Sequence, residues 1–176
     1  MKKPTIIAVV GSKSSGKTTT VEALTKELTK RGYKIAAIKH IPEPNYTIDT
    51  AGKDTWRFAK SGAKTIISIA SNEIATIEKT EKSFTLDEIL QRCKNHDFAL
   101  IEGFRNLVGE NKDILKIVAA KSAEEVLKAQ RIFSPIIAFT GPYSPNGLQL
   151  EIPYVDVLNN PEKIADIVEK YAKKHC

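Results

Sequence analysis

Short apolar runs rich in β-branched residues alternate along this chain with stretches in which apolar residues recur every three or four positions. The runs are typical of strands, and the recurring stretches are typical of amphipathic helices. Gly32 and Gly62 close two of the helical stretches, and Asn160 and Pro161 open the last one. The predicted strands cover residues 5–10, 35–39, 65–70, 74–78, 98–102, 115–119 and 136–140, and the predicted helices cover 17–31, 53–61, 86–94, 123–130 and 161–173.

Strands that alternate with helices predict an α/β fold, in which a mostly parallel sheet has helices on both faces. The two apolar runs within residues 65–78 are an exception, because only Ser71, Asn72 and Glu73 separate them. This short polar connection predicts a β-hairpin. We expect the hairpin to form an antiparallel extension at one edge of the sheet, and an exposed edge invites pairing with a second copy. The sequence therefore predicts a homodimer.

The length of 176 residues suffices for one compact domain with a substantial core, and no linker or low-complexity run divides it. We expect a single domain over residues 1–176. The apolar runs are far shorter than a membrane span, and the basic residues at the N-terminus precede a strand and not a signal-peptide core. A cytoplasmic protein without membrane contact is expected.

The net charge is +6, from 27 Lys and Arg against 21 Asp and Glu. The cations are spread over helices and loops without an interleaved aromatic patch, so we expect no nucleic-acid partner. A basic surface that attracts anionic nucleotides explains the charge equally well. Cys93 and Cys176 fit neither a disulfide framework nor a zinc site.

A glycine-rich loop follows the first predicted strand directly and matches the pattern G-x-x-x-x-G-K-[ST] of a P-loop. Its two glycines allow tight turns, so that backbone N–H groups point at phosphate oxygens, and the following helix adds the positive end of its dipole. Lys17 is expected to reach the β- and γ-phosphates, and the Thr18 hydroxyl to hold Mg²⁺. Lys13 either joins this site or is a solvated loop lysine. The predicted phosphate-binding residues are Gly11, Ser12, Lys13, Ser14, Ser15, Gly16, Lys17, Thr18 and Thr19.

An acidic residue, Glu102, ends the buried run at 98–102 and is followed by a glycine. Ligands of open α/β sheets bind at the carboxyl ends of the strands, which places Glu102 beside the P-loop. We predict that Glu102 is a catalytic carboxylate and, with Thr18, holds Mg²⁺. The alternative is a charged strand end in solvent. Arg105, three positions further on, is predicted to reach phosphates or a partner.

A third informative stretch follows the second predicted strand, with Lys39 and His40 at its start. Both are predicted to contact the nucleotide. His40 would donate a hydrogen bond to a phosphate or shuttle a proton, unless it is an inert loop histidine. Asp49 is either a catalytic carboxylate near the metal or attacking water, or the residue that shapes an Asp-x-x-Gly turn. Lys53 and Arg57 lie one helical turn apart, where they clamp a second anionic ligand or form a solvated face. No Asn-Lys-x-Asp guanine signature occurs in the sequence.

Four motifs together resemble the molybdopterin-guanine dinucleotide biosynthesis protein B family of P-loop NTPases. They are the loop at 11–18, the Lys39-His40 pair, the segment at 52–63 and the strand end at 101–104. The resemblance spans nearly the whole chain. It implies a GTP-binding, slowly hydrolysing Mg²⁺-dependent homodimer. It further implies assistance to the guanylyltransferase that attaches GMP to molybdopterin, with an anionic pterin as a further ligand. Where the family commonly has a second histidine after the Lys-His pair, this chain has residues 41–46.

Two other functions fit the residues. In a small-molecule or nucleotide kinase, Lys53, Arg57 and Arg105 would hold an acceptor, although no arginine-rich cluster follows the fourth predicted helix. In a nucleotide-dependent binding module, hydrolysis would be incidental. Phosphate release without an acceptor argues against the kinase, and tight GTP binding without turnover favours the module.

Overall fold

The computed structural model describes residues 3–143 and 150–173, and it divides the chain into two compact units. The larger unit combines Met1–His40 with Leu86–Cys176, and the smaller unit is Ile41–Thr85. Cys176 lies outside the described residues, whereas Cys93 is a buried free thiol in the larger unit. None of the described helices combines the length and the apolar character that a membrane crossing requires.

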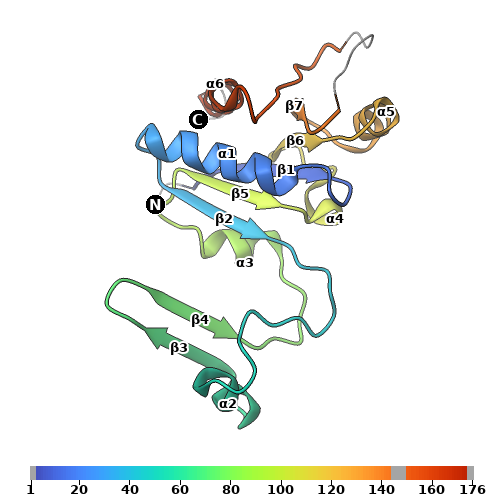
Figure 1. The fold of residues 1–176 in the computed structure, drawn as a ribbon. Helices are drawn as coiled ribbons and strands as arrows, with labels where there is room; N and C mark the ends of the chain where they lie inside the picture. The colour runs from blue at the N-terminus through green and yellow to red at the C-terminus, as the bar shows by residue number, and fades with distance from the viewer. Residues whose placement is uncertain (1–2, 144–149, 174–176) are drawn as a thin grey trace. The chain divides into compact units, whose positions relative to one another are not determined.

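The larger unit is built on a parallel sheet with the strand order β2-β5-β1-β6-β7 (Figure 1). Its central strands are buried on both faces, as the continuous apolar runs predict. Val9 and Lys39 both lie opposite Glu102 in the register, so three strands bring their carboxyl ends to one edge. The strands are β1 (Thr5–Gly11), β2 (Ile35–Lys39), β5 (Phe98–Glu102), β6 (Leu115–Ala119) and β7 (Ile136–Thr140).

Helices cover both faces of this sheet. In β1, Ile7 and Val9 pack against α1 (Lys17–Lys30) and α6 (Pro161–Ala172). The alternate residues of β1 face a second cluster, which includes α4 (Arg105–Val108) and α5 (Ala123–Ile132). The remaining described helix of this unit is α3 (Leu86–Gln91). The period of two along β1 therefore sorts its side chains between two cores.

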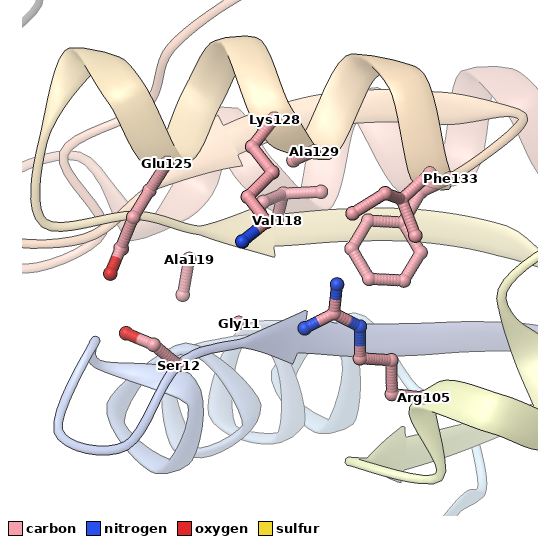
Figure 2. A pocket seen from close by; sticks show the side chains of 10 residues that line it. Gly11, Ser12, Arg105, Val118, Ala119, Glu125, Lys128, Ala129 and Phe133 are labelled. Carbon is pink, nitrogen blue, oxygen red and sulfur yellow. The ribbon is translucent and has the colours of Figure 1, made fainter.

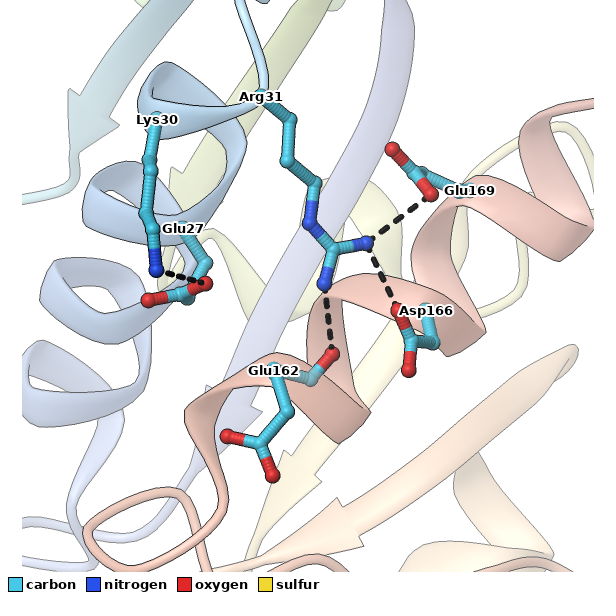
Figure 3. A network of polar contacts seen from close by, with 6 residues as sticks. All are labelled: Glu27, Lys30, Arg31, Glu162, Asp166 and Glu169. Carbon is cyan, nitrogen blue, oxygen red and sulfur yellow. Dashed lines mark hydrogen bonds and ion pairs between the residues drawn. The ribbon is translucent and has the colours of Figure 1, made fainter.

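Arg31, at the C-terminal end of α1, ties that helix to α6 (Figure 3). Its Nη1 atom lies 2.8 Å from Asp166 Oδ1 and 3.0 Å from Glu169 Oε2. Nη2 donates to the Glu162 carbonyl at 3.1 Å. The guanidinium fork thus joins the two helices over one face of the sheet.

The smaller unit contains α2 (Asp54–Lys60) and a hairpin of β3 (Thr65–Ile69) and β4 (Ile74–Glu78). The two strands pair antiparallel and form a sheet of their own. Ile66 on one hairpin face is 5% exposed. The opposite face carries Ile67, Ile69 and Ile74, which are 57%, 77% and 69% exposed.

The predicted α/β fold, with its mostly parallel sheet, helices on both faces and antiparallel hairpin, is confirmed. The expected position of the hairpin is wrong, because among the described strands β3 and β4 hydrogen-bond only to each other and do not extend an edge of the parallel sheet. Every predicted strand is present, and the predicted helices differ from the observed ones only at their ends. The sequence did not predict α4, because four residues are too few for a recognisable period. It also missed the segment around Tyr154, which pairs in parallel with Phe139 of β7.

Candidate functional site

The loop at residues 11–16 turns sharply between β1 and α1. Gly16 caps α1 with φ of +94°, in the left-handed region that favours glycine. A Cβ atom on Gly11 would lie 2.2 Å from the Ala119 carbonyl oxygen and 2.6 Å from Ser15 Oγ. Only glycine therefore allows β1 to enter the loop this close to β6. The arrangement is a strand, a glycine-rich turn and a helix N-terminus, which suits phosphate binding.

Lys17, the first residue of α1, folds back over this loop. Its Nζ donates to the Ser12 carbonyl at 2.6 Å. Burial lowers the pKa of Lys17, and although Glu102 opposes this change, Lys39 and Lys121 add to it. An anion bound in the loop would stabilise the charged ammonium group, so Lys17 is positioned to pair with a phosphate.

Glu102 and Thr18 meet at the carboxyl edge of the sheet, as predicted from the sequence. The Thr18 hydroxyl donates to the Glu102 carboxylate, with both oxygens at 3.1 Å. Lys39 Nζ lies 3.4 Å from Glu102 Oε1. The Glu102 side chain is only 12% exposed, so it is not simply a solvated strand end. A hydroxyl and a carboxylate beside a phosphate loop form an oxygen donor set of the kind that Mg²⁺ prefers.

His40 lies next to the Thr18–Glu102 pair, and it makes its contacts through its backbone N–H and its ring. Its backbone N–H donates to the Glu102 carbonyl at 3.0 Å, and its ring stacks on Phe104 with centroids 4.5 Å apart. A Cβ atom on Gly103 would lie 3.2 Å from His40 Cβ, and both Gly103 and Phe104 have positive φ. The left-handed turn after β5 therefore seats the imidazole against an aromatic ring, beside the Thr18–Glu102 pair.

Arg105 lines a cavity of about 130 Å³ that also includes Gly11 and Ser12 of the loop (Figure 2). The guanidinium group lies 5.4 Å from the centroid of the Phe133 ring. Lys128 of α5 also turns its ammonium group towards the cavity (Figure 2). Among the residues that the structure describes, no carboxylate forms an ion pair with either cation. Both are therefore available to an anionic ligand beside the loop.

Glu125 and Lys121 border the loop from the N-terminal end of α5. Lys121 Nζ donates to the Lys13 carbonyl at 3.1 Å, while the Lys13 side chain is exposed. The Glu125 carboxylate accepts the Lys121 backbone N–H at 2.8 Å. Burial raises the pKa of Glu125, but this hydrogen bond and the nearby lysine charges outweigh it and leave the pKa lowered. Sequence analysis did not single out either residue.

Asp49, Lys53 and Arg57 lie in the smaller unit. The Asp49 Oδ1 atom accepts hydrogen bonds from the Thr55 hydroxyl and the Thr50 N–H, both at 2.8 Å. Its Oδ2 atom is buried, and no described group donates to it. Arg57 Nη1 lies 3.5 Å from Asp54, and both side chains are largely exposed. These contacts agree with a turn-shaping role for Asp49, while its predicted catalytic role and the anion clamp remain predictions.

The sequence profile of the family described as molybdopterin guanine dinucleotide synthesis protein B matches residues 6–139. The chain belongs to this family. A Haemophilus influenzae relative named molybdopterin-guanine dinucleotide biosynthesis adapter protein is 29% identical over 168 residues, covering 94% of this chain and 88% of that protein. A Methanocaldococcus jannaschii relative is 36% identical over 121 residues, covering 68% of this chain and 48% of that protein.

The solved structure of Bacillus subtilis MobB has the same fold as this member of the family. The two superpose with a TM-score of 0.71 at 21% identity, and the match covers 92% of this chain and 96% of that one. The family resemblance expected from the four sequence motifs is therefore confirmed. The glycine-rich loop, Lys39, His40 and Glu102 all fall within the matched residues.

One group beside the loop was missed by sequence analysis altogether. Asp156 lines a cavity with Ser14, Gly16 and Thr19, on the chain that follows β7. The available signal was the pair of apolar residues Val155 and Val157, which are buried on either side of it. That pattern was too short to identify a strand.

Proposed function

We propose that this protein binds GTP with Mg²⁺ at the loop of residues 11–18 and hydrolyses it slowly. The contact between the Thr18 hydroxyl and the Glu102 carboxylate carries the proposal, because it joins the P-loop helix to an acidic strand end. Lys39 and Lys17 add positive charge around the same point. These groups suit a triphosphate with its metal ion.

The donor set fits Mg²⁺ that arrives with a nucleotide. Within the described residues, no group of three His, Cys, Asp or Glu side chains could hold a metal by itself. Mg²⁺ typically keeps several waters and binds through one or two carboxylates and the substrate phosphates. Thr18 and Glu102 would hold such an ion, which supplies positive charge for the phosphate oxygens.

For hydrolysis, Lys17 would neutralise negative charge on the β- and γ-phosphates. To reach the phosphates, the Lys17 side chain would give up its hydrogen bond to the Ser12 carbonyl. With few groups dedicated to activating water, we expect slow turnover.

In the cell, we propose that the protein acts in the cytoplasm as a homodimer that assists the guanylyltransferase of molybdopterin guanine dinucleotide synthesis. The adapter name of the Haemophilus influenzae relative supports a partner in that pathway. Lys53 and Arg57 of the smaller unit are the cations that we propose for an anionic pterin.

The test is a calorimetric titration with GTP and with ATP, each with Mg²⁺, on the wild type and on Lys17→Ala. We expect selective GTP binding by the wild type, and loss of triphosphate affinity in Lys17→Ala with its circular dichroism spectrum unchanged. Lys26→Ala is the matched control, because Lys26 is an exposed lysine on the same helix. An unchanged titration in Lys17→Ala would show that the site is wrongly assigned.

A small-molecule or nucleotide kinase is the second candidate function, and the cavity lined by Arg105 and Lys128 favours it. The cavity shares Ser12 with the loop and could hold an anionic acceptor there. Phosphate release from GTP in the absence of any acceptor would argue against this candidate.

A further inference from the structure

A cavity of about 210 Å³ adjoins the loop where α1 begins. One wall belongs to the loop and α1, through Ser14, Gly16 and Thr19. The other wall comes from the chain after β7. It consists of Gly141, Pro142, Asp156, Val157 and Leu158.

The position of Asp156 follows from an extra pairing beside β7. Phe139 N–H donates to the Pro153 carbonyl and Val155 N–H to the Phe139 carbonyl, both at 2.8 Å. This segment runs parallel to β7, so Asp156 emerges at the carboxyl edge, where open α/β sheets bind ligands. The Tyr154 hydroxyl donates to the Gly141 carbonyl, so two parts of the wall that follows β7 are joined to each other.

Gly141 brings this wall into contact with the loop. A Cβ atom there would lie 2.3 Å from the Ala120 carbonyl oxygen and 2.9 Å from that of Ser15, and its φ is +119°. A Cβ atom on Gly16 would lie 3.7 Å from Gly141 Cα. Two glycines therefore allow the turn after β7 to pack directly against the phosphate loop.

The Asp156 carboxylate is held in place by its own turn. Oδ1 accepts from the backbone N–H of Leu158 at 3.0 Å and of Asn159 at 3.3 Å, and Oδ2 accepts from the Asn159 side-chain amide at 2.7 Å. The hydrogen bonds from Asn159, side chain first, lower the pKa of Asp156, so the carboxylate is charged at neutral pH. A carboxylate offers about four acceptor positions, and these bonds leave Oδ2 able to accept another donor.

The rest of the cavity wall is apolar. Leu158 is 75% exposed although it is a large hydrophobic residue, and Pro142 and the buried Val157 lie nearby. An apolar wall with a single fixed acceptor suits a flat heterocycle that carries N–H donors on one edge.

We propose that this cavity takes the purine base of the nucleotide, and that Asp156 selects guanine by accepting its N1–H and 2-amino groups. The inference rests on the proposed function, since the loop must hold the phosphates for the base to reach the cavity. Adenine has an acceptor at N1, which a carboxylate repels. Asp156, from the segment after β7, would thus take the place of the Asn-Lys-x-Asp guanine signature that the sequence lacks.

The first test uses the wild-type protein alone. Calorimetric titrations with Mg²⁺ compare GTP, ITP, ATP and inorganic tripolyphosphate. ITP lacks only the 2-amino group of guanine, and we expect it and ATP to bind roughly tenfold or more weakly than GTP, as the loss of a charge-assisted hydrogen bond implies. Equal affinities for GTP, ITP and ATP would overturn the role of Asp156.

The second test is Asp156→Asn, titrated with GTP, XTP and tripolyphosphate. An Asn amide can accept from N1–H and donate to the 2-oxo group of xanthine, so we expect roughly tenfold weaker GTP binding and stronger XTP binding. Asp87→Asn, an exposed aspartate at the start of α3, is the matched control. Unchanged GTP and XTP affinities in Asp156→Asn would overturn the proposal.

Tripolyphosphate separates this proposal from the one on which it rests. It has no base, so the wild type and Asp156→Asn should bind it equally. If tripolyphosphate binds but GTP has no advantage over ATP, the loop site stands and the base cavity is wrong. If neither tripolyphosphate nor any nucleotide binds, the proposed function itself fails, and the base cavity fails with it.

Discussion

Glu102 shows how much a single side chain depends on its neighbours in this protein. It lies between a hydroxyl donor, Thr18, and an ammonium group, Lys39, at an edge where three parallel strands end. The same residue at a solvent-facing strand end would have no such partners. Its neighbours hold the carboxylate at a position that suits a phosphate-bound metal ion.

We expect Glu102→Gln to shift the Mg²⁺ dependence of nucleotide binding and hydrolysis to higher metal concentrations. A carboxamide keeps the shape of the side chain and can bond Thr18, but it loses the charge, so the apparent Mg²⁺ affinity should fall roughly 10- to 100-fold. Phosphate release as a function of Mg²⁺ concentration measures this effect. Glu110→Gln, at an exposed position of the same unit, should change nothing. Normal metal-dependent hydrolysis in Glu102→Gln would mean that another carboxylate holds the ion.

Lys116 of β6 is a buried lysine outside the proposed nucleotide site. Its Nζ donates to the carbonyls of Asn111 and Ser134, the latter at 2.6 Å. Burial lowers the pKa of Lys116 to about 8, although Asp113 opposes the shift. The unfolded chain therefore binds more protons above this pH than the folded protein does, and stability should increase with pH in that range.

The expected contribution of Lys116 to the free energy of unfolding rises by about 2 kcal/mol between pH 8 and about pH 10. Urea denaturation of the wild type and of Lys116→Met across this range isolates it, because other titrating groups are common to both. The wild type should gain stability relative to Lys116→Met as the pH rises from 8 to about 10. A constant difference would show that Lys116 titrates at its ordinary pKa.

At the scale of elements, α1 does two things at once. Its first turn carries Lys17 and Thr18, and its last turn joins α6 through Arg31. The apolar residues Leu24 and Leu28 between these ends are fully buried against the sheet. A helix fixed at both its core face and its C-terminal end holds its N-terminus still for ligand binding.

We expect Arg31→Ala to lower the free energy of unfolding by about 1–2 kcal/mol, because it removes a bidentate pairing to α6 that is only partly exposed. Chemical denaturation measures this loss. Lys30→Ala is the matched control, since Lys30 is exposed and lies 3.9 Å from Glu27, so its loss should cost less than about 0.5 kcal/mol. Equal losses in the two variants would contradict the role given to Arg31.

At the scale of the whole molecule, the smaller unit bears the apolar surface that a homodimer could bury. Ile69 and Ile74 lie opposite each other in the hairpin register, and Ile67 lies on the same face as Ile69. All three are exposed in a single copy. Exposed apolar faces of this kind often mark protein–protein contacts.

We predict that the wild type sediments as a dimer and that Ile69→Lys combined with Ile74→Lys sediments at the monomer mass of 19.5 kDa. Burying two ammonium groups at the contact would be unfavourable. Ser68→Lys, in the same strand but on the opposite face, should leave the dimer intact. A wild type of monomer mass at working concentration would refute the dimer.

Most of the fold, and the positions of the residues at the proposed phosphate end of the site, could be predicted from the sequence because they depend on local patterns. A strand next to a glycine-rich turn and a helix identified Lys17 and Thr18, and parallel strand ends brought Glu102 to them. Such features need only neighbours along the chain and the general rule that parallel strands share one edge. The continuous apolar runs likewise indicated that the central strands are buried on both faces.

The tertiary structure alone decided which distant side chains gather at the other end of the loop. Asp156 reaches the cavity through a short pairing beside β7 and the close approach of Gly141 to Ser15. Arg105 and Lys128 meet across another cavity from two different helices. No local pattern encodes these meetings, because they depend on packing between segments far apart in the chain, which determines where each side chain can lie.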